Sequence, residues 1–218
     1  MSLTKNTLRS LEVSVTDMPP LSSFPQSHQV TFNYYVGVIH FLDESYVKAE
    51  DYLTAAYTKS LANSPANTKL ILTYLVPTRL ITSGLLPTDA ILAPYPSLRD
   101  LFAPIASCIK KGDLAGFDSA LAAGEDEFVK RRIYLTLERG RDVCMRNLFR
   151  KVFLAGGYEI PKEGQSDAAT TQVRRSRVPI SEFAAALRIG GEQDVEGEEV
   201  ECLIAAQIYK VCSLLATR

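Results

Sequence analysis

Apolar positions recur with a helical period through most of the first 150 residues. At about 100° per residue, they group on one face of successive segments, and residues that favour turns separate these segments. The segments expected to be helical are residues 32–41, 46–61, 66–83, 88–93, 98–111, 114–123 and 133–152. The pattern predicts an all-helical stack of antiparallel helix pairs, a solenoid-like arrangement that presents surface to partners.

The first helix pair has the packing pattern of a tetratricopeptide-type (TPR-like) helical hairpin. Gly37, Ala49, Leu53 and Ala56 are separated by twelve, four and three residues. These are the spacings of the small and large packing positions in such repeats. Because glycine and alanine let two helices approach closely while leucine fills the remaining gap, we predict a structural role for these positions.

Breaker residues mark the expected helix ends. Residues 18–25 contain three prolines, so residues 1–28 are expected to form an irregular N-terminal segment, with the end of a helix over residues 4–11 as the alternative for its first part. Pro77 is expected to kink helix 66–83 or to end it near Val76, because proline lacks an amide hydrogen. Gly112 and Asp113 are expected to close one helix and to cap the next.

Residues 133–152 are expected to form one long helix, or two in tandem hinged near Gly140. One apolar arc is expected to be buried, and its members are Ile133, Tyr134, Leu137, Cys144, Met145, Leu148 and Val152. On the opposite side, four arginines fall within about 40° of each other. These are Arg132, Arg139, Arg146 and Arg150.

This arginine row is locally unusual. Residues 130–151 contain eight basic residues and two acids, whereas the whole chain has a formal net charge of −1. The acids at residues 125–127 are expected to start the basic helix, where the helix dipole favours negative charge. The row is either a solvated helix face or a surface that meets phosphate or an acidic partner, since guanidinium groups suit both ligands.

The pattern changes after Leu154. Residues 156–177 are polar, and we predict a mobile loop there. Its last residues include Arg174, Arg175 and Arg177, which belong either to a solvated linker or to an electrostatic tether for nucleic acid.

The last part of the chain has the element order of a winged helix. Residues 177–180 are expected to be extended, Ser181 to cap a helix over 182–187, and residues 199–210 to form another helix. Residues 192–201 hold six acids and no base. Such a helix would repel a nucleic-acid duplex, so base reading by this element is disfavoured.

Composition narrows the classes of function. The 218 residues, 46% of them hydrophobic, are enough for one large domain or two small ones. No apolar run reaches the length of a membrane helix, and no secretion signal is seen. Four cysteines without paired spacing and two histidines favour neither a zinc site nor a nucleophile pair. Without a phosphate loop or nucleophile elbow, we predict no enzyme, no catalytic residue, no metal and no cofactor.

A helical stack that leads directly into a winged helix resembles the PCI domain of the proteasome lid, the signalosome and translation initiation factor three. Residues 112–121 (GDLAGFDSAL) resemble one of its helical repeats, and residues 145–152 (MRNLFRKV) its junction helix. Residues 180–187 and 198–209 resemble its winged-helix core. The tyrosine-containing segments 34–53 and 72–80 look most like one branch of the family. This branch comprises the signalosome-subunit-twelve-like proteins and the PCI subunit of the TREX-two mRNA-export complex.

The resemblance covers residues 4–209 and implies a mainly α fold, with TPR-like helical repeats followed by a winged-helix module. The domains implied are the irregular segment 1–28, a helical-repeat part over 29–143 and a winged-helix part over 144–218 with a mobile loop at 156–177. Relatives carry further N-terminal repeats and a β-hairpin wing. The chain is therefore expected to be a fragment, a variant gene product or a trimmed sequence with an incomplete winged helix.

The resemblance also implies a function. The chain is expected to be a non-enzymatic scaffold subunit of a nuclear complex for transcription-coupled mRNA processing and export, with a cytoplasmic location as an alternative. Expected partners are a second PCI-domain protein, a small acidic subunit and RNA or DNA, but no membrane. The residues expected to bind nucleic acid are Arg132, Arg139, Arg146, Arg150, Lys151, Arg174, Arg175 and Arg177. The alternative is a signalosome-type or other protein–protein interaction module without nucleic-acid contact.

Overall fold

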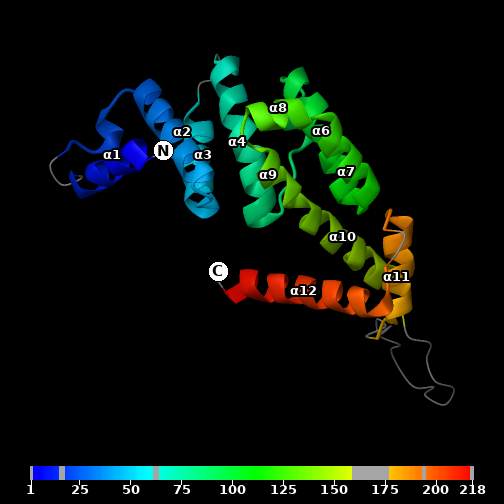
Figure 1. Cartoon of the computed structure of the whole chain (residues 1–218). Helices are drawn as coiled ribbons and strands as arrows, with labels where there is room; N and C mark the ends of the chain where they lie inside the picture. The colour runs from blue at the N-terminus through cyan, green and yellow to red at the C-terminus, as the bar shows by residue number, and fades with distance from the viewer. Residues whose placement is uncertain (1, 15–17, 61–63, 159–176, 193–194, 217–218) are drawn as a thin grey trace, which may run out of the picture. The chain divides into compact units, whose positions relative to one another are not determined.

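The computed structural model describes residues 2–14, 18–60, 64–158, 177–192 and 195–216 (Figure 1). Throughout these ranges the regular structure is helical, and they contain no β-strand. The chain divides into two compact units. The first comprises Met1–Ala106 and Gly124–Gly140, and the second Ser107–Ala123 and Arg141–Arg218. The prediction of a mainly α fold is confirmed.

The helices follow one another with short connections. Those of the first unit are α1 (Ser2–Val13), α2 (Gln26–Leu42), α3 (Tyr46–Lys59), α4 (Pro65–Ser83), α5 (Asp89–Leu92), α8 (Glu125–Lys130) and α9 (Tyr134–Glu138). Those of the second unit are α7 (Leu114–Ala123), α11 (Ile180–Ile189) and α12 (Gly197–Ala216). Two helices contain a unit boundary, namely α6 (Pro96–Lys111) and α10 (Gly140–Ala155). The unit boundary at Gly140 falls close to the predicted domain boundary at 143/144, which stays a prediction.

Helices α2 and α3 pack as the small-residue pattern predicts. A Cβ atom added to Gly37 would lie 2.7 Å from Leu53 Cγ, far inside van der Waals contact. Ala49, Leu53 and Ala56 are all completely buried. The close approach of the two helices therefore depends on glycine at position 37, and the predicted packing role of these residues is confirmed.

Helix α4 runs through Pro77, so the alternative that it ends near Val76 is wrong. Leu75, Val76 and Leu80 are buried on α4, which packs against both α2 and α3. Burying these side chains offsets the backbone hydrogen bond that proline cannot donate. The helix ends at Gly84, whose φ of 64° is the left-handed conformation expected of a terminating glycine.

The prediction that residues 1–28 are irregular is wrong, whereas the alternative of a helix over residues 4–11 is confirmed. Residues 2–13 form α1, and α2 already begins at Gln26. Pro25 is the N-cap of α2, so the proline that ends the irregular stretch also sets the start of the helix. Between the two helices, the described residues contain only a short 3₁₀ turn, Leu21–Ser23.

In the second unit, Gly112 and Asp113 close α6 and cap α7 as predicted. Gly112 has a φ of +70°, and the Gly116 amide donates a hydrogen bond of 2.8 Å to Asp113 Oδ1. This carboxylate satisfies one of the free amides at the start of α7. The Ala115 amide donates to the Gly190 carbonyl over 2.9 Å, which ties the start of α7 to the end of α11.

The C-terminal module is partly as predicted. Helix α11 begins at Ile180 with Pro179 as its N-cap, so the prediction of Ser181 as the cap is wrong. The ring of Pro179 fixes its φ, which is −62°, and its ψ of 143° makes the backbone extended just before the helix. The ring of Phe183 meets that of Phe149 edge-on at 5.4 Å, and α11 contacts α12. The predicted mobile loop at 156–177 falls largely on residues 159–176, which lie outside the described residues.

Candidate nucleic-acid interface

Residues 133–152 form two helices in tandem. Helix α9 ends at Glu138, Arg139 is its C-cap, and α10 begins at Gly140. The hinge predicted near Gly140 is confirmed, and the single long helix is wrong. The predicted apolar arc is buried in part: Ile133, Leu137, Cys144 and Met145 are buried, whereas Tyr134, Leu148 and Val152 are half-buried.

Arg132 lies outside both helices. It has a φ of +58° and follows the C-cap of α8, where the Ile133 amide donates to the Phe128 carbonyl over 2.9 Å. The acids at residues 125–127 therefore start α8, a short helix of its own, and not the basic helix as predicted.

These breaks invalidate the prediction that four arginines share one helix face. The angular argument requires one continuous helix, and the chain turns at Arg132 and again at Arg139. Arg132 and Arg139 belong to the first unit, and Arg146 and Arg150 to the second. The structure brings only Arg146 and Arg150 onto one helix, one turn apart on α10.

Arg139 is held by contacts within the first unit. Its Nη2 donates to Glu44 Oε2 over 2.8 Å, and its Nη1 donates to the Tyr46 hydroxyl over 3.3 Å. The guanidinium also lies 5.8 Å from the centre of the Tyr46 ring. The hydrogen bond with Glu44 raises the pKa of Arg139. A phosphate would have to compete with this carboxylate, so Arg139 is the weaker candidate for binding nucleic acid.

Arg141 also has internal partners, in the second unit. Its Nε donates to Asp118 over 3.0 Å, and its Nη2 donates to Glu192. Burial alone would lower the pKa of Arg141, but the hydrogen bonds with Glu192 and Asp118 outweigh burial and raise it. Arg141 therefore joins α10 to α7 and to the segment after α11, and its charge is neutralised.

Arg146 and Arg150 differ from these two arginines. Arg146 is half-buried and Arg150 is exposed, and neither has a carboxylate partner within the described part of the chain. Among the described residues, nothing neutralises these two charges. We expect such unpaired guanidinium groups to favour phosphate or carboxylate.

Lys151 connects Arg150 to two lysines that the sequence analysis missed. Its Nζ donates a hydrogen bond of 2.9 Å to the Lys111 carbonyl. This contact places the last turn of α6 beside α10, and the side chains of Lys110 and Lys111 in that turn are exposed. The only local signal for them was the basic pair at the end of a helix. We name the set of Lys110, Lys111, Arg146, Arg150 and Lys151 the α10 basic cluster.

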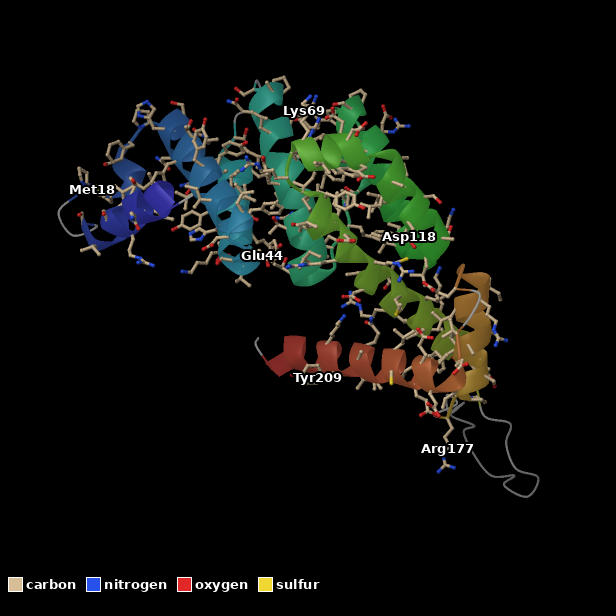
Figure 2. All side chains as sticks on the ribbon, in the orientation of Figure 1. Met18, Glu44, Lys69, Asp118, Arg177 and Tyr209 are labelled. Carbon is tan, nitrogen blue, oxygen red and sulfur yellow. The ribbon has the colours of Figure 1, made fainter. Side chains whose placement is uncertain are left out.

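Of the three arginines predicted in the loop, one is described. Arg177 is exposed just before α11, and Figure 2 shows its side chain extending away from that helix. Arg174 and Arg175 lie outside the described residues.

Cys144, on α10, is poorly suited to nucleophilic chemistry. Cys144 is buried, and its Sγ donates to the Cys108 carbonyl over 3.5 Å. Burial raises the pKa of the Cys144 thiol to about 12, so the reactive thiolate is disfavoured near neutral pH. Among the residues that the structure describes, no group of histidine, cysteine and acidic side chains is arranged to hold a metal ion. None of the helices in the described part is long and apolar enough to cross a membrane.

No family model matches the chain, but several known proteins are similar to it. It is 56% identical over 210 residues to the protein CSN12 homolog of Neurospora crassa, covering 96% of this chain and 45% of that protein. It is 36% identical over 208 residues to the CSN12 homolog of Schizosaccharomyces pombe, covering 95% and 45%. It is 33% identical over 187 residues to the PCI domain-containing protein 2 homolog of Drosophila melanogaster, covering 86% and 42%. The chain spans slightly less than half the length of these relatives. Together with the helical architecture, these similarities show that the chain belongs to the PCI-domain family, in the branch of the CSN12 and PCI domain-containing protein 2 homologues.

Proposed function

We propose that this chain is a non-enzymatic scaffold subunit of a nuclear complex for transcription-coupled mRNA processing and export, in which the α10 basic cluster contacts RNA. The observation that supports the RNA contact is that neither Arg146 nor Arg150 has a carboxylate partner among the residues that the structure describes. Their neighbours Arg139 and Arg141 are engaged by carboxylates of the same chain. The fold thus neutralises some of the local positive charge and leaves the rest at the surface of α10.

A cluster of this kind suits a phosphate backbone. Each cation that neutralises a phosphate releases condensed counterions, which favours binding regardless of base sequence. Arginine adds a planar fork of donors that matches phosphate oxygens. The acids at the start of α12, Glu198 and Glu199, keep that helix itself from approaching nucleic acid.

The scaffold role rests on the family and on exposed apolar side chains of the second unit. Ile189 is 88% exposed at the end of α11, and Ile208 and Tyr209 are 59% and 75% exposed on α12 (Figure 2). Tyrosine and aliphatic side chains form the cores of protein interfaces. We propose that a second PCI-domain protein covers these residues, and that a small acidic subunit is the other protein partner.

The alternative is a signalosome-type protein-binding module without nucleic-acid contact. The same exposed residues of α11 and α12 favour it, because they call for a protein partner and not for RNA. In this case the α10 basic cluster would bind the acidic subunit.

A salt titration tests the RNA contact. We expect the chain to bind a short fluorescein-labelled oligouridine, with an affinity that falls steeply as the KCl concentration rises. Three phosphate contacts give a slope of log affinity against log salt of about −2 for a single strand. Fluorescence anisotropy measures this slope. Affinity that is absent or independent of salt would favour the protein-binding alternative.

The expected protein partner is tested by co-purification of the tagged chain from an extract of its source organism. We expect a second PCI-domain protein to be recovered, and Tyr209→Glu to abolish its recovery because a charge would be buried without a partner. Circular dichroism of the variant checks the fold, and Arg99→Glu serves as a surface control. Recovery of a complex without another PCI-domain protein would contradict the proposal.

A further inference from the structure

Two non-glycine residues of the first unit have a left-handed backbone conformation. Glu44 has a φ of 59° and Arg132 a φ of 58°, and each directly follows a helix C-cap. Glycine is the usual residue at this position, because a side chain there clashes with the following carbonyl. Each of the two residues therefore stays at its position at a free-energy cost.

The side chains of Glu44 and Arg132 differ in their contacts within the described residues. The Glu44 carboxylate accepts the 2.8 Å hydrogen bond from Arg139. Arg132 is exposed and has neither a hydrogen bond nor an ion pair from its side chain within the described part of the chain. Its backbone conformation is fixed by the next residue, Ile133, which is completely buried. The burial of Ile133 accounts for the turn but not for an arginine in place of glycine. An exposed arginine with no side-chain contact among the described residues favours an external ligand.

Arg132 lies two residues before α9, and α9 packs against α4, the helix that carries Tyr74. Burial raises the pKa of Tyr74, while the positive charges of Arg132 and Arg131 act in the opposite direction. Arg131 is already paired with Glu127 over 2.9 Å. Of these two arginines, Arg132 is therefore the one without a carboxylate partner among the described residues. Figure 1 shows α9, which follows Arg132, lying against α4, and the two helices are in contact.

Tyr74 belongs to a row of tyrosines. The centre of its ring lies 6.3 Å from that of Tyr34, which in turn lies 5.2 Å from that of Tyr35. Tyr34 packs against the buried core of α2, α3 and α4, and burial raises its pKa to about 12. Tyr35 is 61% exposed. We name Tyr34, Tyr35, Tyr74 and Arg132 the tyrosine–arginine patch.

We propose that the tyrosine–arginine patch binds single-stranded RNA, with a base stacked on the exposed ring of Tyr35 and a phosphate held by Arg132. The patch combines a flat aromatic surface with an unpaired cation, and a nucleotide combines a flat base with an anion. An acidic peptide would use the cation but not the aromatic surface. The proposal rests on the proposed RNA binding and adds a second contact, on residues separate from the α10 basic cluster.

Arg132→Gly is the sharpest test of the phosphate contact. Glycine is the residue that the backbone favours at this position, so the urea midpoint of unfolding is expected to stay level or to rise. Oligouridine affinity is nevertheless expected to fall severalfold, and the salt slope to decrease by about 0.7, the loss of one phosphate contact. Lys130→Gln is the matched control, because it removes an exposed charge two residues away that is already paired with Glu127.

Tyr35→Ala tests the stacked base. Affinity for oligouridine is expected to fall roughly tenfold, the usual effect of removing one stacking ring. The salt slope is expected to stay the same, since no charge is lost. Tyr35→Phe keeps the ring and is expected to bind normally. For an abasic oligonucleotide of equal length, Tyr35→Ala is expected to have no effect.

Unchanged oligouridine affinity in both Arg132→Gly and Tyr35→Ala would overturn this inference while leaving the α10 basic cluster untouched. Loss of affinity in these variants, with no effect of charge reversal on α10, would instead support the patch and contradict the proposed site on α10. An equal loss of polyglutamate binding in Tyr35→Ala would show a protein site and overturn the inference. A wild-type chain that binds no RNA would contradict both.

Discussion

Gly112→Ala is expected to lower the free energy of unfolding of the second unit by about 3 kcal/mol. Gly112 has a φ of +70°, which an alanine adopts only at a cost of about 1 kcal/mol. Its added Cβ would also lie 2.8 Å from the Cα of Leu148, a backbone atom of α10 that cannot rotate away. Either α10 or the turn between α6 and α7 must shift, and such overpacking costs roughly 1–3 kcal/mol.

Gly157→Ala is the matched control. Gly157 has nearly the same φ, +69°, but nothing lies within 4 Å of where its Cβ would be. Gly157→Ala is expected to lower the free energy of unfolding by only about 1 kcal/mol, the cost of the left-handed backbone alone. Urea unfolding followed by circular dichroism gives both values, and hydrogen exchange of α10 amides shows whether the loss is local. Equal costs for the two variants would show that α10 is not fixed against Gly112.

The contact at Gly112 also bears on the candidate site. On either side of it along α10, Asn147 Nδ2 donates to the Ile109 carbonyl over 3.0 Å, and Lys151 Nζ donates to the Lys111 carbonyl. These bonds and the close approach at Gly112 hold the last turn of α6 beside α10. A shift of α10 in Gly112→Ala is therefore expected to separate Lys110 and Lys111 from Lys151.

Helix ends are predictable from sequence where the terminating residue itself favours a helix end, as glycine does through a positive φ and aspartate through capping. Gly84 and Gly112 have a positive φ, and Asp113 accepts the capping hydrogen bond. The end of α8 carried no such signal, because the residue in the left-handed conformation is Arg132 and not glycine. What ends this helix is the burial of Ile133, a tertiary effect that local pattern does not contain.

The charge state of the candidate site likewise could not be predicted from the local sequence. The local excess of arginine was visible in the sequence, but which arginines remain unpaired depends on carboxylates far away along the chain. Arg139 pairs with Glu44, 95 residues earlier, and Arg141 pairs with Asp118 and Glu192, 23 and 51 residues away. Which arginines are paired with carboxylates can therefore be seen only in the folded structure.

Reversing Arg146 and Arg150 to glutamate is expected to weaken RNA binding by about 100-fold or more, because two phosphate contacts are lost and two repulsive charges replace them. The milder pair Arg146→Gln and Arg150→Gln removes the contacts without the repulsion. It is expected to lose affinity by roughly tenfold and to lower the salt slope by about 1.4. Fluorescence anisotropy with oligouridine measures both, and circular dichroism checks that each variant remains helical.

A second double reversal separates a local site from a general electrostatic field. Arg99 and Arg188 are exposed and have no carboxylate partner within the described residues, so Arg99→Glu with Arg188→Glu changes the net charge equally. Neither residue belongs to the α10 basic cluster, and charges that make no direct contact are partly screened by salt, so this control is expected to lose affinity only a few-fold. Equal losses in the two double variants would mean that RNA senses overall charge. If neither variant loses affinity, α10 is not the RNA contact. In that case Arg146 and Arg150 are left for the acidic subunit, whose binding the first variant would then abolish.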